Sequence, residues 1–156
     1  MERKRILFVC TYQGARAIIA EEYIKQFAPG KIEAFSSCFE PGKITRLPID
    51  VMREVGITLP VESPKSVFHR HKDGEIFDYV ITLCHFASSE QCPDFKRSVN
   101  TLYAKEAESI SWSIPDFLSL RGTEEEKKAA ARAIRDKIKS EVIFFLKRIG
   151  IAAEIE

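Results

Sequence analysis

The chain has 156 residues, of which 45% are hydrophobic, and a formal net charge of +1 at pH 7. This length suits one ordinary domain with its own core, so we expect a single domain over residues 1–156. A nearly neutral chain has no basic or acidic field for nucleic acid or a membrane surface, and we expect neither as a partner. The opening MERKR-ILFVC contains too short an apolar run for a signal peptide or a spanning helix. We therefore expect a cytoplasmic protein.

Strand and helix signals alternate along the chain. Runs of β-branched and aromatic residues predict strands at residues 5–10, 32–37 and 77–84, with a weaker signal at 99–104. Between them, apolar residues at helical spacing and their stop signals predict helices at residues 15–27, 48–55 and 66–71.

The last helix has the clearest start. Thr123 followed by Glu126 forms a capping box, and apolar residues then recur at helical spacing from Ile134 to Ile149. Strands that alternate with helices imply a mostly parallel sheet covered on both faces. We therefore predict an α/β fold with a central four-stranded parallel sheet flanked by helices.

The four cysteines, Cys10, Cys38, Cys84 and Cys92, are too few and too scattered for a disulfide scaffold. Cysteines of this kind in a reducing compartment are buried, catalytic or metal-binding. The chain contains no CxxC motif, and His69 and His71 are two positions apart, which is not zinc-ligand spacing, so we expect no metal. We also expect no organic cofactor. Cys38 has no evident partner and is interpreted as a packing residue.

A candidate oxyanion-binding loop follows the first predicted strand, in the sequence ILFVC-TYQGA-RAIIAEEY. The backbone N–H groups of such a turn, the following helix N-terminus and the guanidinium of Arg16 together suit an anion. The same field favours the thiolate of Cys10. The alternative is a buried cysteine beside a surface arginine. We expect Cys10 to be the nucleophile, Arg16 the anion clamp, and the loop to comprise Thr11, Tyr12, Gln13, Gly14, Ala15 and Arg16.

Four segments resemble the low-molecular-weight protein tyrosine phosphatase superfamily, and in particular its thioredoxin-coupled arsenate reductases. They are VCTYQGAR, AFSSCFEPGK, CHFASSEQCP and SWSIPDF-LSLRGTEEEKKAAARAIRDKI, so the resemblance covers nearly the whole chain. It implies the fold of that family. Three positions depart from the family pattern: Ala17 replaces a serine or threonine, Gln13 replaces an asparagine, and Tyr12 stands where glycine is common.

Asp116, in the sequence SIPDF, is the candidate general acid. A thiolate that attacks a phosphate or arsenate needs a group to protonate the leaving oxygen, and the resemblance aligns Asp116 with the family's acid. The family's following proline is here Phe117, whereas Pro115 precedes the aspartate. The alternative for Asp116 is an N-capping or solvent-facing role.

Cys84 ends a predicted buried strand, and Cys92 follows eight positions later across a polar segment. A segment of that length can bring two sulfur atoms within bonding distance or let them part. The alternative is one buried and one surface thiol without redox function. The resemblance implies a relay from Cys10 to Cys84 to Cys92 by thiol–disulfide exchange, with thioredoxin as electron donor.

Three functions follow from these features. The first is an arsenate reductase with the three-cysteine relay. The second is a phosphotyrosine phosphatase that acts through a phosphocysteine at Cys10. The third is an oxyanion-binding protein that kept the loop and lost efficient chemistry, which the departures at Tyr12, Gln13 and Ala17 favour.

Overall fold

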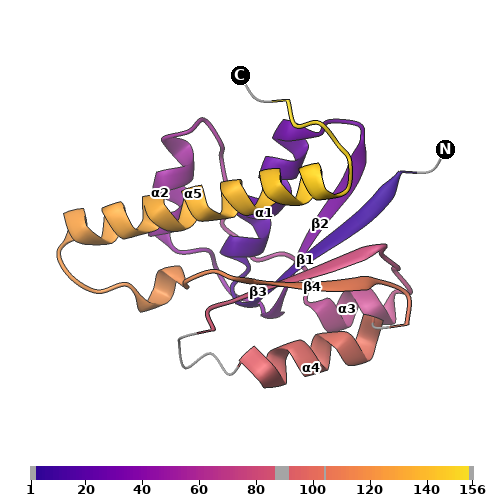
Figure 1. Ribbon diagram of the computed structural model, residues 1–156. Helices are drawn as coiled ribbons and strands as arrows, with labels where there is room; N and C mark the ends of the chain where they lie inside the picture. The colour runs from indigo at the N-terminus through magenta and orange to yellow at the C-terminus, as the bar shows by residue number, and fades with distance from the viewer. Residues whose placement is uncertain (1–2, 87–91, 104, 155–156) are drawn as a thin grey trace.

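The computed structural model describes residues 3–86, 92–103 and 105–154, and its centre is a four-stranded parallel sheet (Figure 1). The order across the sheet is β2-β1-β3-β4, and every neighbouring pair is parallel. The strands are β1 (Lys4–Tyr12), β2 (Ile32–Glu40), β3 (Tyr79–Cys84) and β4 (Glu108–Ser113). The predicted fold class is confirmed.

Helices cover both faces of this sheet, as a parallel sheet requires (Figure 1). Three of them lie on one face: α1 (Ala15–Phe27), α2 (Arg46–Arg53) and the long α5 (Glu124–Arg148). The other face carries α3 (Val67–Lys72) and α4 (Cys92–Tyr103).

The core is accordingly divided in two by the sheet. Side chains alternate along β1, because successive residues of a strand point to opposite faces. Ile6, Phe8 and Cys10 belong to the core on the α1 and α5 side, whereas Leu7 and Val9 belong to the core on the α3 and α4 side. All five are fully buried, which explains why β1 is a continuous apolar run.

Most predicted elements agree with the structure within a few residues. The helix predicted at residues 15–27 has these bounds in the structure. The capping box of Thr123 and Glu126 is formed: the Thr123 hydroxyl accepts from the Glu126 N–H, and the Glu126 carboxylate accepts from the Thr123 N–H, both at 3.1 Å. The strand predicted at residues 5–10 is longer, since β1 continues to Tyr12.

The strand predicted at residues 99–104 is wrong. Val99 and Tyr103 belong to α4, and Ala104 lies outside the described residues. Phe95, Val99 and Tyr103 are buried on one face of this helix at four-residue spacing. The fourth strand is instead β4, with the sequence ESISWS, in which Trp112 is the buried residue. As an edge strand with few apolar side chains, it has a weak sequence signal.

An ion-pair network joins helices α2 and α5, which are far apart in the sequence but pack against each other. Glu54, at the end of α2, accepts hydrogen bonds from Arg132 at 2.8 Å and from Arg135 at 3.0 Å. Arg135 also donates to the Val51 carbonyl oxygen at 2.9 Å. The hydrogen bond from Arg132 foremost, together with Arg135, lowers the pKa of Glu54 to about 2.

Replacing Glu54 by glutamine is expected to lower the melting temperature at neutral pH and to have less effect in acid. A carboxylate whose pKa falls on folding contributes stability above its unfolded pKa of about 4.3 and loses it as the pH falls towards 2. The melting temperatures of the two proteins should therefore converge between these pH values. Glu141→Gln, elsewhere on α5, is the control for a change in net charge. A constant difference between Glu54→Gln and the wild type down to about pH 3 would contradict this assignment.

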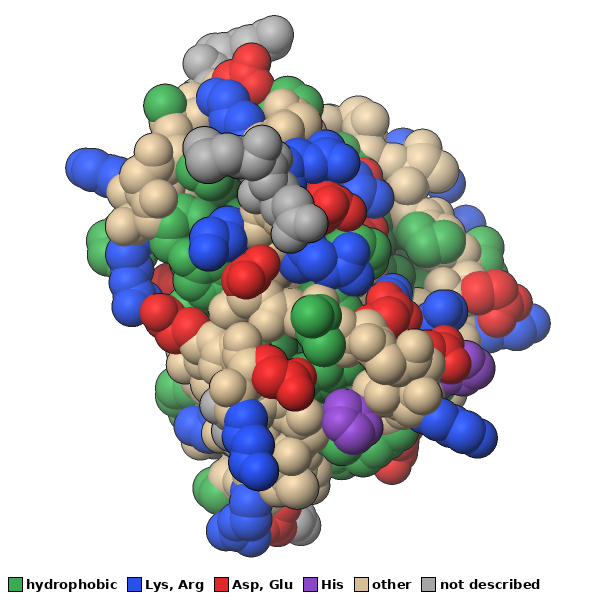
Figure 2. Space-filling model, turned by 90° about the vertical axis from the view of Figure 1, so that its right-hand side faces the viewer, with side chains coloured by type: hydrophobic (Ala, Val, Ile, Leu, Met, Phe, Trp, Pro, Cys, Tyr) green, Lys and Arg blue, Asp and Glu red, His purple; other side chains and the backbone are tan. Residues whose placement is uncertain are grey.

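The end of the molecule where the strands begin has a mixed surface (Figure 2). Lysine, arginine, aspartate and glutamate side chains are interspersed there, and Arg5 lies within 4 Å of both Glu33 and Glu75. Among the described residues, no helix has the length and apolar character to cross a membrane, and no three potential metal ligands cluster.

Candidate functional site

Cys10 lies near the carboxyl end of β1, between two neighbouring strands. Its register partners are Cys38 in β2 and Leu83 in β3. Its side chain is fully buried on the α1 side of the sheet. In open α/β sheets this edge is where ligands bind.

The Cys10 loop, defined as residues 10–16, joins β1 to α1 through two residues with positive φ. Gln13 has φ 58° and Gly14, which caps α1, has φ 94°. The Gly14 N–H donates to the Tyr12 carbonyl oxygen at 2.6 Å, and the Gln13 N–H donates to the Glu40 carbonyl oxygen at 3.0 Å. Strand β1 pairs with β2 as far as Tyr12 and Glu40, and α1 begins at Ala15. The turn between the two elements therefore consists of Gln13 and Gly14 alone, which is shorter than the sequence predicted.

Glycine is required at position 14 for two reasons. The left-handed conformation there is rarely adopted by other residues. A Cβ atom would also collide with the ring of Pro64, coming within 2.7 Å of its Cγ, and would approach the Cβ of Cys38 to 3.6 Å. Pro64 and Cys38 thus lie directly against the turn that holds Cys10.

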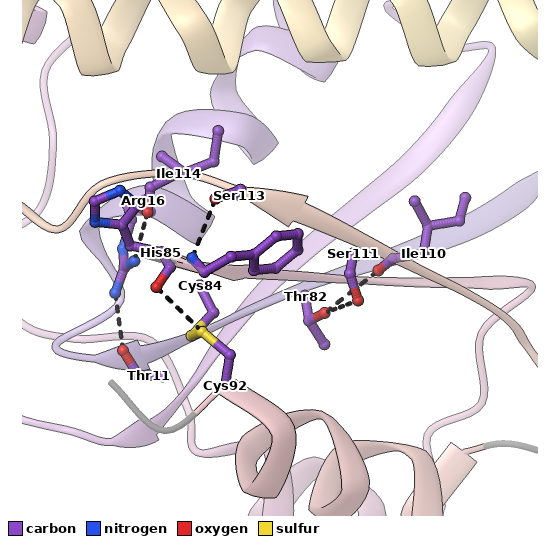
Figure 3. Close-up of a disulfide and its surroundings, with 11 residues drawn as sticks. Thr11, Arg16, Thr82, Cys84, His85, Cys92, Ile110, Ser111, Ser113 and Ile114 are labelled. Atoms are coloured by element: carbon purple, nitrogen blue, oxygen red, sulfur yellow. Dashed lines mark hydrogen bonds between the residues drawn. A yellow bond between two sulfur atoms is a disulfide. The ribbon is translucent and has the colours of Figure 1, made fainter. Parts of the chain in front are cut away.

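Arg16 lies in the first turn of α1 and is only 1% exposed. It donates from Nη1 to the Ile114 carbonyl oxygen at 2.9 Å and from Nη2 to Thr11 Oγ1 at 2.8 Å (Figure 3). These bonds fix the guanidinium between the Cys10 loop and the segment that follows β4. A buried guanidinium held in place in this way is suited to a planar, bidentate anion contact.

Asp116 lies two residues beyond Ile114 and is half-buried. Its Oδ1 accepts from the Leu118 N–H at 3.1 Å and caps the short 3₁₀ helix η1 (Phe117–Ser119). The capping role that the sequence left open is therefore present. Because Arg16 binds the Ile114 carbonyl oxygen, the segment that leads to Asp116 begins beside the Cys10 loop.

Cys84 and Cys92 are joined by a disulfide whose Cα atoms are 5.9 Å apart (Figure 3). Cys84 is the last residue of β3 and Cys92 the first described residue of α4. Both sulfur atoms lie in the core on the α4 side of the sheet, opposite the face to which Cys10 belongs. The Cys84 carbonyl oxygen accepts from the Ile114 N–H at 3.3 Å, so Ile114 connects the disulfide to Arg16.

The position of Cys38 could not be read from the sequence. It is fully buried, as expected for a packing residue, yet it is also the register partner of Cys10. Burial, and to a lesser degree the charge of Cys10, raise the pKa of the Cys38 thiol to about 12. The only sequence signal for this pairing is that both cysteines lie near the carboxyl ends of predicted strands. The pairing itself depends on which strands are neighbours in the sheet, which the sequence patterns do not give.

Three further residues lie around or beneath the loop. Trp112 is buried and packs on Phe8 with ring centroids 5.6 Å apart, so it contributes to the core. Ala17 is fully buried among apolar side chains, and as an alanine it offers no hydroxyl to the loop. Tyr12 is 39% exposed at the rim of the loop.

The sheet, the C-x5-R sequence that runs from the end of β1 into α1, and the aspartate after β4 define an α/β protein of the cysteine-phosphatase type. The chain belongs to the low molecular weight phosphotyrosine protein phosphatase family, whose sequence model matches residues 5–154. The family expected from the sequence is thereby confirmed.

Two bacterial arsenate reductases are similar to this chain over almost their full length. The chain is 30% identical to an arsenate reductase of Bacillus subtilis and 28% identical to one of Halalkalibacterium halodurans. Each match covers 88% of this chain and 91% of the relative.

Solved structures share the fold at lower identity. An arsenate reductase in its oxidised state has a TM-score of 0.71 at 21% identity, covering 94% of this chain and 99% of that one. A thioredoxin-dependent arsenate reductase of Corynebacterium glutamicum has a TM-score of 0.60 at 20% identity and covers 94% of this chain and 62% of that one. An arginine phosphatase of Geobacillus stearothermophilus has a TM-score of 0.66 at 18% identity, covering 94% and 92%.

Proposed function

We propose that this protein reduces arsenate to arsenite through Cys10, Cys84 and Cys92, with thioredoxin as the electron donor. The observation that carries the proposal is the Cys84–Cys92 disulfide, formed on the strand next to Cys10. Hydrolysis of a phosphate ester at Cys10 requires neither of these two cysteines. The arsenate reductases among the sequence relatives support the same conclusion. A thiol relay of this kind operates in a reducing compartment, which agrees with a cytoplasmic location.

Arsenate would bind at the Cys10 loop. The first turn of α1 presents N–H groups that lack intrahelical acceptors, and the helix dipole adds partial positive charge. Arg16 provides the planar donor pair that fits a tetrahedral oxyanion. Two of the five N–H donors of Arg16 bond to Ile114 and Thr11, which fixes the orientation of the guanidinium that the anion would meet.

The first chemical step joins the Cys10 sulfur to arsenic. The thiolate attacks As(V), and an arsenate hydroxyl leaves as water after receiving a proton. Asp116, on the segment that Arg16 holds beside the loop, is the proposed proton donor. No electron is transferred in this step.

The second step carries out the reduction. Cys84 as thiolate attacks the Cys10 sulfur, the sulfur–arsenic bond breaks, and its electron pair leaves with arsenic as arsenite. The product is a Cys10–Cys84 disulfide, so two sulfur atoms are oxidised as As(V) becomes As(III). In this step the Cys84 side chain, at the last residue of β3, must turn away from the face where the disulfide holds it.

The third step restores Cys10. Cys92 attacks Cys84, Cys10 leaves as a thiolate, and the Cys84–Cys92 disulfide forms. The structure has this bond, so it corresponds to the end of the proposed cycle. Thioredoxin then reduces the disulfide by supplying two electrons and two protons.

Steady-state assays on two substrates test this function. Wild-type protein with thioredoxin, its reductase and NADPH is expected to consume NADPH in proportion to the arsenate added. The same protein without thioredoxin should release one arsenite per molecule and stop. Continued arsenate turnover in a Cys92→Ser variant at the wild-type rate would contradict the relay.

A phosphatase is the second candidate, favoured by Asp116 on the segment whose Ile114 carbonyl oxygen binds Arg16. In that case Cys10 forms a phosphocysteine that water hydrolyses, with phosphotyrosine as substrate. The protein would then hydrolyse an aryl phosphate catalytically and leave arsenate unreduced. Binding of phosphate without turnover of either substrate would instead identify an oxyanion-binding protein, as the residues at Tyr12, Gln13 and Ala17 suggested.

A further inference from the structure

Cys38 and Cys10 form a second pair of cysteines that the relay does not use. They are direct register partners in the parallel strands β2 and β1. Neighbouring strands lie about 4.7–4.9 Å apart, and register partners of parallel strands project to the same face. This separation falls within the Cα–Cα range of about 4.4–6.8 Å that a disulfide spans.

Cys84 is placed differently with respect to Cys10. Its sulfur is engaged with Cys92, in the core on the opposite face of the sheet. After the proposed relay has run, Cys10 and Cys38 are the two cysteines that remain outside a disulfide. In this form Cys84 has no thiol with which to attack an oxidised Cys10.

The surroundings hold Cys38 against the Cys10 loop. A Cβ added at Gly14 would lie 3.6 Å from the Cβ of Cys38, so the Cys38 side chain lies next to the turn that follows Cys10. The Cys38 sulfur lies 3.7 Å from the Pro64 carbonyl oxygen, and the Cys38 N–H donates to the Lys65 carbonyl oxygen at 3.4 Å. These contacts from a third segment limit how far Cys38 can move away.

We propose that Cys38 is a resolving thiol for Cys10: when a peroxide oxidises Cys10 to the sulfenic acid, Cys38 closes a Cys10–Cys38 disulfide that protects the nucleophile. The proposal shares with the proposed function only the reactivity of Cys10. It requires neither arsenate nor thioredoxin.

The chemistry balances with hydrogen peroxide as oxidant. The Cys10 thiolate attacks one peroxide oxygen, the O–O bond breaks, and hydroxide leaves, which gives the sulfenic acid. The Cys38 sulfur then attacks the Cys10 sulfur, and the hydroxyl leaves as water with the Cys38 proton. The two sulfur atoms lose two electrons in total, and the peroxide is reduced to two molecules of water.

The electrostatics separate the roles of the two thiols. Cys38 has a pKa of about 12, mainly because it is buried, and so it stays protonated and does not itself react first with peroxide. The charge of Cys10 contributes to that raised pKa. Oxidation to the uncharged sulfenic acid removes this smaller contribution to the pKa of Cys38, whereas the contribution of burial remains.

Peptide mapping after peroxide treatment tests the proposal. The starting protein has the Cys84–Cys92 disulfide formed and Cys10 and Cys38 reduced. With excess hydrogen peroxide, the wild type is expected to lose the mass of two hydrogen atoms and to give a Cys10–Cys38 linked peptide. Dithiothreitol should then return the Cys10 thiol to alkylation. Cys38→Ser should instead gain oxygen at Cys10 as sulfinic or sulfonic acid, which dithiothreitol does not reverse.

Two further variants keep the test independent of how Cys38→Ser folds. The double variant Cys84→Ser/Cys92→Ser retains Cys10 and Cys38 as its only cysteines and is expected to form the same linked peptide. Cys38→Ala should reproduce the loss of protection. Irreversible oxidation of Cys10 in the wild type as fast as in Cys38→Ser, with no linked peptide, would overturn the proposal. Arsenate turnover by the untreated wild type is unaffected by that result, so failure of the two proposals is distinguishable.

Discussion

Replacing Cys84 by serine is expected to stop arsenate reduction while binding of phosphate at the Cys10 loop persists. In the proposed relay, the Cys84 sulfur is the group that takes Cys10 away from arsenic, and a hydroxyl cannot form the required disulfide. Multiple-turnover arsenate reduction should fall by on the order of 1000-fold or more, as is typical when a covalent catalytic group is removed. Phosphate affinity, measured by calorimetry on the reduced protein, should stay within about twofold, because Cys84 lies on the opposite face of the sheet.

The control for this prediction is Cys10→Ser, which should abolish both arsenate reduction and any hydrolysis of an aryl phosphate. The two variants therefore separate a role in electron transfer from a role in attack on the oxyanion. If Cys84→Ser turns over arsenate with thioredoxin at a rate close to that of the wild type, Cys84 has no part in the relay.

Replacing Gly14 by alanine is expected to weaken phosphate binding and to slow arsenate reduction by on the order of 100-fold, since a displacement of about 1 Å in an active site has a rate effect of this size. The substitution places a side chain at φ 94°, which costs about 1–2 kcal/mol. It also forces the new methyl group against Pro64, an overpacking that costs about 1–3 kcal/mol. The turn must move to relieve this contact, and Cys10 and Arg16 at its two ends move with it.

Gly56→Ala is the matched control for Gly14→Ala. Gly56 has φ 80°, and a Cβ there would meet nothing within 4 Å, so this variant has the backbone strain without the collision. It should lose stability and keep its phosphate affinity. Calorimetric titration of both variants decides the question. Equal phosphate affinity in Gly14→Ala and Gly56→Ala would show that the turn at Gly14 does not shape the binding site.

Local signals in the sequence were sufficient for the elements that hold the Cys10 loop. The apolar run of β1, the loop glycine and the apolar face of α1 all lie within about 25 consecutive residues, and each has a recognised pattern. The capping box of α5 is equally local. Such features depend on neighbouring residues alone, which is why the predicted bounds of α1 agree with the structure.

Contacts between distant segments were beyond the reach of the sequence patterns. Arg16 binds the carbonyl oxygen of Ile114, 98 positions away, and no local signal announces such a bond. The pairing of Cys10 with Cys38 depends on the strand order, which puts β2 next to β1. For this reason Cys38 was interpreted as packing alone.

The wrong strand at residues 99–104 has a related cause. Val99 and Tyr103 are apolar because they face β3 from a helix, and a short apolar run does not distinguish the two kinds of element. The true edge strand β4 is polar on most of its length, since serine and glutamate side chains there are partly exposed. The role of Asp116, which follows β4, stays a prediction that rests on the family resemblance and not on a local pattern.

A single-turnover experiment tests the three-cysteine relay most directly. Fully reduced protein receives one equivalent of arsenate without added thiol and is quenched with an alkylating agent, and its disulfides are mapped by mass spectrometry. The relay predicts one equivalent of arsenite, a Cys84–Cys92 disulfide, and Cys10 and Cys38 recovered as alkylated thiols. If all four cysteines are recovered as thiols and arsenate is unchanged, while the same protein hydrolyses an aryl phosphate, the relay is contradicted and the protein is a phosphatase.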